Sequence, residues 1–163
     1  MSSTETFRTI DELAQQCGHY CWVETRLFEI TGQWASGDGP AEWRLFCSVI
    51  SGQHAALATQ WRSRLPVRAG VDQQALIRQP ETMGSAVTAL GGQTIEAGLP
   101  VLLQEVLPEL VLQYRQLLDE ASPVREAPVI ASLTMAVGTH ADSIPRVPPS
   151  CNWSSRSPGF GTF

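Results

Sequence analysis

A single histidine lies in the middle of an apolar helical stripe in the stretch SVISGQHAALATQW, residues 48–61. In helical proteins that hold two metal ions between their helices, such a histidine is half of a Glu-x-x-His motif, in which a glutamate precedes it by three residues. Here the histidine is His54, and the residue three positions earlier is Ser51. The stretch therefore leaves three alternatives for His54: a metal ligand, a group with another chemical role, or a structural core residue.

Helical periodicity predicts which other polar side chains face the same interior as His54. Successive residues of a helix are turned by about 100°, so each polar residue can be placed relative to the apolar face of its own segment. The polar residues that this placement directs inward are Glu24, His54, Tyr114 and His140. Ser51 and Val137 occupy the two positions where the motif glutamates would stand. A complete di-metal site, which needs about four carboxylates and two histidines, is therefore not expected.

One carboxylate and two histidines, Glu24, His54 and His140, would still suffice for a single iron or manganese ion, or for a zinc ion. Their expected heights along the helices argue against this arrangement. At ~1.5 Å per residue, Glu24 and His54 are expected ~10–15 Å from one end of the molecule and His140 ~25 Å from that end. We therefore predict no bound cofactor, and we keep iron or manganese at these three residues as the alternative.

Glu24, His54 and Tyr114 are expected at one height and can act together. A buried glutamate is costly unless it has partners, and an imidazole and a phenol hydroxyl are natural ones. The three could transfer protons in the isomerisation, cyclisation or elimination of a small molecule, with His54 as acid or base, Glu24 orienting it and Tyr114 donating a hydrogen bond. The alternative is a polar network that only fixes the register of the helices. The residues thus predict a small-molecule pocket, for binding or for metal-independent acid–base catalysis.

Four long helical segments must position these side chains. Apolar residues recur at spacings of three and four over residues 18–34, 41–64, 94–120 and 123–144. Pro123 suits the opening turn of the last segment, whereas Pro108 predicts a kink in the third. Residues 67–92 are less regular, and we expect a long connection with one or two short helices there.

The lengths of the connections predict an all-α fold with the crossover arrangement of ferritin-like four-helix bundles. The first and second segments, and the third and fourth, are joined by short turns, while the middle connection is long enough to run the length of the molecule. We expect a polar N-terminal segment at residues 1–16, the bundle at 17–144, and an irregular tail rich in Pro, Ser and Gly at 145–163.

Composition narrows the classes of partner. The chain has 163 residues and a net charge of −5, and its 11 basic residues, all arginines, are scattered, so no nucleic-acid partner is expected. No apolar run reaches the ~18 residues of a membrane span. The opening residues MSSTETFRTIDELAQQ lack the basic and apolar regions of an export signal, which predicts a cytoplasmic protein. The four cysteines show no disulfide or zinc spacing and are expected to be small core residues.

Three blocks of the chain resemble a group of uncharacterised ferritin-like proteins common in actinobacteria. The blocks are YCWVETRLFEITGQW, HAALATQWRSRLP and LPELVLQYRQLLDEASPVREAPVIASL, within residues 20–144. The resemblance implies the four-helix fold. It also implies a doubled histidine and further His and Glu residues in the second block, but only His54 matches, with Gln53, Leu57 and Thr59 at the other places. The resemblance therefore favours a ferritin-like protein with a degenerate di-iron site.

An interaction module is the remaining hypothesis. Trp22 is expected on the outer face of the first helix, away from its apolar side, where it could contact a second copy of the chain. The Pro- and Ser-rich tail could dock on a partner or on a dimer mate. The sequence thus leaves a homodimer open beside the small-molecule ligand.

Overall fold

The computed structural model describes residues 8–143 and 146–151, and every regular element in this part of the chain is a helix. The predicted all-α class is confirmed. Among the described residues, no helix combines the length and the apolar character needed to cross a membrane.

The first helix, α1, spans Ile10–Ser36 and begins well before the expected start at residue 18. A capping box starts it: the backbone N–H of Glu12 donates to the Thr9 hydroxyl across 3.2 Å, and the Thr9 N–H donates to the Glu12 carboxylate across 2.7 Å. Two acidic residues in the first turn also suit the positive end of the helix dipole. Residues 10–16 therefore belong to α1, whereas the sequence pattern assigned them to a separate polar segment.

The second helix, α2, spans Ala41–Arg62, close to the expected 41–64. It packs along the length of α1, to which it is joined by the Gly- and Pro-containing turn. Trp22 of α1 is half-buried and packs against the core. The prediction that it lies on the outer face, away from the core, is therefore wrong. Phe28 of α1 is 42% exposed.

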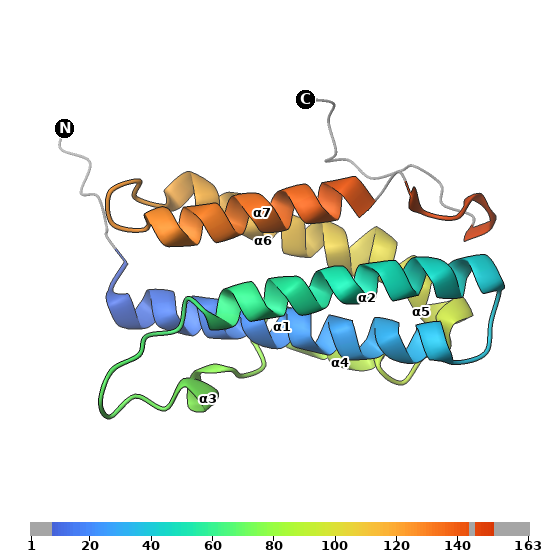
Figure 1. Cartoon of the computed structure of the whole chain (residues 1–163), viewed down its shortest axis with the longest axis horizontal. Coiled ribbons are helices and arrows are strands. Elements are labelled where there is room, and N and C mark those ends of the chain that lie inside the picture. The colour runs from blue at the N-terminus through green and yellow to red at the C-terminus, as the bar shows by residue number, and fades with distance from the viewer. Residues whose placement is uncertain (1–7, 144–145, 152–163) are drawn as a thin grey trace.

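The long connection holds two short helices, α3 (Gln73–Leu76) and α4 (Gly84–Leu90), as expected. It runs back along α1, which contacts both of them (Figure 1). Gly18 of α1 makes this approach possible, because a Cβ there would lie 2.0 Å from the carbonyl oxygen of Leu76. The connection thereby returns the chain to the end of the molecule where the next helix starts.

The third long segment consists of three consecutive pieces rather than one kinked helix: α5 (Ile95–Val101), the π-helical turn η1 (Leu102–Val106) and α6 (Leu107–Glu120). Pro108 has no N–H to donate to the carbonyl four residues earlier, so the regular ladder cannot continue through it. The N–H of Leu107 donates to the carbonyl of Leu102, five residues back, which is the π pattern. The wider turn thus precedes the proline.

The last long helix, α7, spans Ala127–Ser143, and its start was expected at residue 123. The intervening residues form a turn, in which the Glu126 carboxylate accepts a hydrogen bond from the N–H of Ser122 across 2.7 Å. α7 packs against α6 and also against α2. α1 and α7 begin at the same end of the molecule (Figure 1).

The predicted tail at 145–163 includes a structured piece. The 3-10 turn η3 (Pro149–Cys151) is tied to the start of α2, because Trp43 Nε1 donates to the hydroxyl oxygen of Ser150 across 2.8 Å. Cys151 is buried. Residues 144–145 and 152–163 of the predicted tail, and residues 1–7 of the predicted N-terminal segment, lie outside the described part of the chain.

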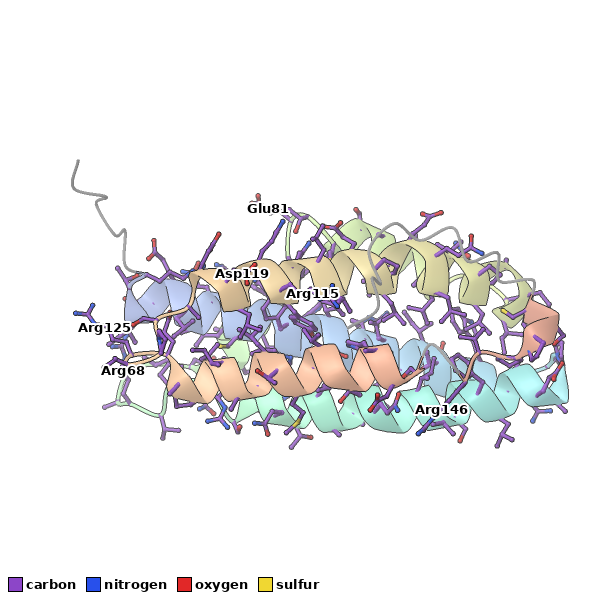
Figure 2. All side chains as sticks on the ribbon, turned by 90° about the horizontal axis from the view of Figure 1, so that it is seen from above. Arg68, Glu81, Arg115, Asp119, Arg125 and Arg146 are labelled. Carbon is purple, nitrogen blue, oxygen red and sulfur yellow. The ribbon has the colours of Figure 1, made fainter. Side chains whose placement is uncertain are left out.

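Apolar side chains fill the space between the long helices, and charged groups such as Arg68 and Arg125 lie at the ends and edges (Figure 2). Fully buried members of this core include Leu27, Ile50, Leu57, Leu110 and Leu133. The four cysteines are buried and free, as expected for small core residues.

Candidate functional site

Four buried polar side chains meet near the middle of the molecule, each from a different helix. They are Glu24 of α1, His54 of α2, Tyr114 of α6 and His140 of α7. Their exposed fractions are 0, 1, 0 and 3%, in that order. The inward orientation expected for all four is confirmed, because apolar neighbours at helical spacing fix the rotation of each helix about its axis.

The Glu24 carboxylate is the centre of this cluster and touches the other three side chains. Nδ1 of His54 lies 2.6 Å from Oε2 of Glu24. The Tyr114 hydroxyl donates to Oε1 across 2.5 Å, and Nε2 of His140 lies 3.0 Å from the same oxygen. Hydrogen bonds to a carboxylate are short and strong, and together they offset the cost of burying its charge.

The expected separation of His140 from the other residues is wrong. The prediction separated His140 from Glu24 by ~10–15 Å because it started α1 too late, which placed Glu24 too low, and α7 too early, which placed His140 too high. With α1 starting at Ile10 and α7 at Ala127, Glu24 lies ~21 Å and His140 ~20 Å from the end where these helices begin. The imidazole rings of His54 and His140 consequently lie 5.3 Å apart, centroid to centroid.

The cluster keeps Glu24 ionised. Burial alone would raise the pKa of this carboxyl, but the imidazoles of His140 and His54 outweigh burial through charge and hydrogen bonding. They hold the pKa of Glu24 well below its usual range. The carboxylate is therefore a negative charge in a fully buried site at any pH near neutrality.

Two of the donors around the carboxylate, His54 and Tyr114, favour their uncharged forms. Burial lowers the pKa of His54, with Glu24 acting in the opposite direction, so this histidine favours its neutral form and can donate one N–H. Burial and then the charge of Glu24 raise the pKa of Tyr114 well above its ordinary value, so its hydroxyl stays protonated. His54 and Tyr114 thus meet the negative charge of Glu24 as uncharged donors.

Aromatic rings cover one side of the cluster. Tyr20 of α1 packs edge-on against Tyr114, with ring centroids 4.6 Å apart, and Trp61 of α2 stacks on Tyr114 at 5.6 Å. The Nε1 atom of Trp61 is buried and makes no hydrogen bond within the described residues. The rings exclude water from the Tyr114 side of the carboxylate.

Glu24, His54 and His140 also meet the requirement for a metal site. One donor atom from each lies within 4.8 Å of the others, and all three residues are buried. Two imidazole nitrogens and one carboxylate suit iron, manganese or zinc, with the remaining coordination positions left to other ligands. Ser51 donates to the carbonyl oxygen of Phe28 across 3.0 Å, and Val137 packs against the core, so neither position adds a carboxylate.

The structure thus brings together the three residues expected to share a height, Glu24, His54 and Tyr114, and adds His140 to them. Tyr20 and Trp61 also contact Tyr114, and these two contacts were not predicted from the sequence. Their spacing from the polar residues, four before Glu24 and seven after His54, is the signal that could have placed them on the same faces.

Comparison of the chain with family models, with curated proteins and with solved structures gives no match. The resemblance to a ferritin-like family therefore stays a prediction.

Proposed function

We propose that the chain is a ferritin-like four-helix bundle that binds one iron or manganese ion at Glu24, His54 and His140, as a mononuclear oxidase or oxygenase does. The observation that carries this proposal is the convergence of these three donors, from three helices, within 4.8 Å of one another in the buried interior. The expected distance of His140 from the other two ligands along the helices counted against such a site. The observed contact of His140 with Glu24, at 3.0 Å, removes this objection.

The order and length of the helices support the bundle. Two antiparallel pairs, α1 with α2 and α6 with α7, are separated by the long connection that carries α3 and α4. Connections of this kind are found in ferritin-like proteins, whose metal sites are built from side chains on facing helices. The proposed ligands follow the same rule, because α1, α2 and α7 each provide one.

The residues around the ligands have defined parts in this proposal. A bound iron or manganese ion would supply oxygen chemistry, which the side chains of this cluster cannot do alone. Tyr114 would orient the carboxylate of Glu24 through its hydroxyl, as a hydrogen-bonded neighbour of a metal ligand commonly does. Tyr20 and Trp61 would keep bulk water from that side of the centre.

Metal titration of chelator-treated protein tests the proposal. Wild-type protein should bind one equivalent of Mn²⁺ or, without oxygen, Fe²⁺, and Co²⁺ should give the visible spectrum of a nitrogen- and oxygen-bound ion. His54→Ala and His140→Ala should lose this binding, because each removes a ligand. His19→Ala is the matched control, because His19 is the one remaining histidine of the sequence and lies outside the cluster. This variant should keep full metal binding.

Tyr114→Phe extends the test, since it removes a neighbour but no ligand and should keep the stoichiometry. Binding far below one equivalent in the wild type, or equal binding by wild type and His54→Ala, would show that these residues hold no ion.

A second candidate function follows from the hydrogen bonds themselves. Glu24 already accepts from three groups, so the cluster is satisfied without a cation. In this case Glu24, His54 and Tyr114 would perform metal-independent acid–base chemistry on a small molecule, with His54 as the proton carrier. Wild-type protein that binds no metal, together with loss of turnover in a folded His54→Ala variant, would favour this candidate.

Self-association remains a proposal of its own. Leu45 and Val49 lie on the outer face of α2 and are 69 and 44% exposed, which suits contact with a second copy. A monomer in sedimentation at micromolar concentration would count against a homodimer.

A further inference from the structure

A cavity of about 520 Å³ is lined in part by Tyr20, whose ring packs against Tyr114 of the buried cluster. It opens between α1, the part of the connection just before α4, and α6. Its volume is within the range of ~300–1,000 Å³ that small-molecule sites occupy. Glu24, His54 and His140 do not line it, so it is a separate site from the proposed metal centre.

Two close approaches fix the walls of this cavity. The carbonyl of Leu76 rests against Gly18, where a Cβ would lie 2.0 Å from its oxygen, and this holds the connection on α1. The side chain of Gln79 lies over Gly84, where a Cβ would be 2.2 Å from its Cγ. The wall that the connection contributes is therefore packed in place, which reduces the cost of ordering it around a ligand.

Amide side chains give the lining its chemistry. Four of the lining residues are glutamines, and they are Gln15, Gln16, Gln79 and Gln113. Each amide carries two N–H donors and a carbonyl acceptor without a charge, and one donor of Gln113 is already used by the Glu109 carboxylate across 3.0 Å. Such a set matches a ligand whose own donors and acceptors alternate, as hydroxyl and amide groups do.

The ionisable groups of the lining balance one another. Arg78 and Glu81 carry opposite charges, and Glu81 lies toward the outer edge of the molecule (Figure 2). Burial and then the charge of Arg78 lower the pKa of the half-buried His19, with Glu81 opposing them, so His19 favours its neutral form. The lining has no net charge near neutrality and therefore favours neither an anion nor a cation.

Tyr20, Val23 and Pro80 form the apolar part of the lining. Tyr20 is only 3% exposed, and its hydroxyl donates to the carbonyl oxygen of Gln113 across 3.5 Å. Its ring packs against Trp61 and Tyr114, with centroids 5.0 and 4.6 Å away, so only a small part of it borders the cavity. A ligand with polar edges and an apolar face fits this combination better than a purely polar ion does.

We propose that this cavity binds a small uncharged molecule rich in hydroxyl or amide groups, which contacts the glutamine amides with its polar groups and the apolar part of the lining elsewhere. Two sources share this chemistry, a sugar or polyol and a nucleobase-like amide. The proposal does not depend on a metal at Glu24, because no proposed ligand lines the cavity.

Ligand titration followed by NMR tests the site, with the ring signals of His19 as the reporter. The probes are trehalose and myo-inositol for the first source, uridine for the second, and sulfate and tetramethylammonium as charged comparisons. A neutral probe should shift the His19 signals with a Kd of about 1 mM or tighter, and added NaCl should leave that Kd unchanged because no net charge is involved.

Two matched variants on α1 test whether the probe binds in this cavity. Gln16→Ala removes a lining amide and should raise the Kd of the neutral probe roughly threefold to tenfold. Gln33→Ala removes an exposed amide of the same helix outside the cavity and should leave binding unchanged.

Three outcomes would overturn the proposal. One is the absence of any shift with all three neutral probes, and another is tighter binding of sulfate or tetramethylammonium than of any neutral probe. The third is equal weakening by Gln16→Ala and Gln33→Ala, which would place the probe elsewhere. Saturable binding of trehalose or myo-inositol alone would identify the polyol source, and binding of uridine alone would identify the amide source.

Discussion

Glu24→Gln changes the charge at the centre of the buried cluster while nearly preserving its shape. The amide can still accept from the Tyr114 hydroxyl through its oxygen and can meet His54 through its nitrogen. The variant therefore separates the negative charge of Glu24 from its size. Chelator-treated protein is the material for this test, so that only protons occupy the cluster.

The pKa of His54 should fall in Glu24→Gln. The carboxylate lies 2.6 Å from Nδ1 of His54 and favours the protonated imidazole, in opposition to burial. Without that charge, burial and the neighbouring His140 act on His54 unopposed. The titration midpoint of His54, already below its ordinary value, should move lower still.

The dependence of stability on pH follows from the same shifts. The pKa of His54 is lower in the folded chain than in the unfolded one, so the unfolded chain binds the extra proton as the pH drops below ~6.5. Stability then falls with pH by up to about 1.4 kcal/mol per pH unit until the folded pKa is reached. Glu24, whose folded pKa is depressed, stabilises the fold above its unfolded pKa of ~4.3 and loses that contribution as the pH falls further. The Gln variant lacks this second loss.

Near neutral pH the two substitutions at Glu24 should differ in cost. Glu24→Gln should lower the free energy of unfolding by about 1 kcal/mol, because the hydrogen bonds are replaced rather than removed. Glu24→Leu leaves the hydroxyl of Tyr114 and the N–H groups of His54 and His140 without an acceptor, and it should cost about 3 kcal/mol. Equal costs would mean that these hydrogen bonds contribute little.

Two measurements decide the prediction: histidine ring signals against pH, and urea unfolding at several pH values. His19 is the internal reference, because it lies outside the cluster and should titrate alike in both proteins. Identical His54 titrations in wild type and Glu24→Gln would refute the reasoning, since the two side chains would then not interact.

Further predictions concern the fold that holds the cluster. Gly18→Ala should destabilise the protein by about 1–3 kcal/mol in urea unfolding, because its Cβ would meet the carbonyl of Leu76 at 2.0 Å. Gly52→Ala, at a helical position with no atom within 4 Å of the new Cβ, should instead stabilise it by about 0.5–1 kcal/mol, and destabilisation there would indicate a contact on that face. Thr9→Ala should cost about 1 kcal/mol by removing the capping box of α1, and amide hydrogen exchange should speed up in the first turn; unchanged exchange would show that α1 does not depend on this cap.

The rotation of each helix could be predicted from sequence, but the heights of its residues could not. Rotation depends on local spacing, so the apolar neighbours of Glu24, His54, Tyr114 and His140 sufficed to turn all four inward. Height depends on where a helix starts, and an error there shifts every later residue by ~1.5 Å per position. The start of α1 was nevertheless readable, because Thr9 and Glu12 form the Thr-x-x-Glu pattern of a capping box.

Other features depend on contacts between distant segments and had no local signal. The cavity beside Tyr20 exists because the connection crosses α1 at Gly18, and the sequence pattern shows only that this connection is long. Predicting the π turn η1 would likewise have required knowing where Pro108 falls in the hydrogen-bond ladder of its helix. The half-buried state of Trp22 reflects packing that periodicity on one helix does not describe.

Stability alone does not account for four polar side chains at one height in the core. A well-packed apolar layer is often as stable as a buried charged cluster or more so, because burying a charge is costly even when it is paired. A fixed register could also be set by one polar contact rather than three. A buried negative charge with two imidazoles at hydrogen-bond distance is what either a bound cation or a transferred proton requires. The two differ in the part of His140: a metal ion needs it as a ligand, whereas proton transfer among Glu24, His54 and Tyr114 can proceed without it. His140→Ala is therefore the variant whose effect separates the two functions.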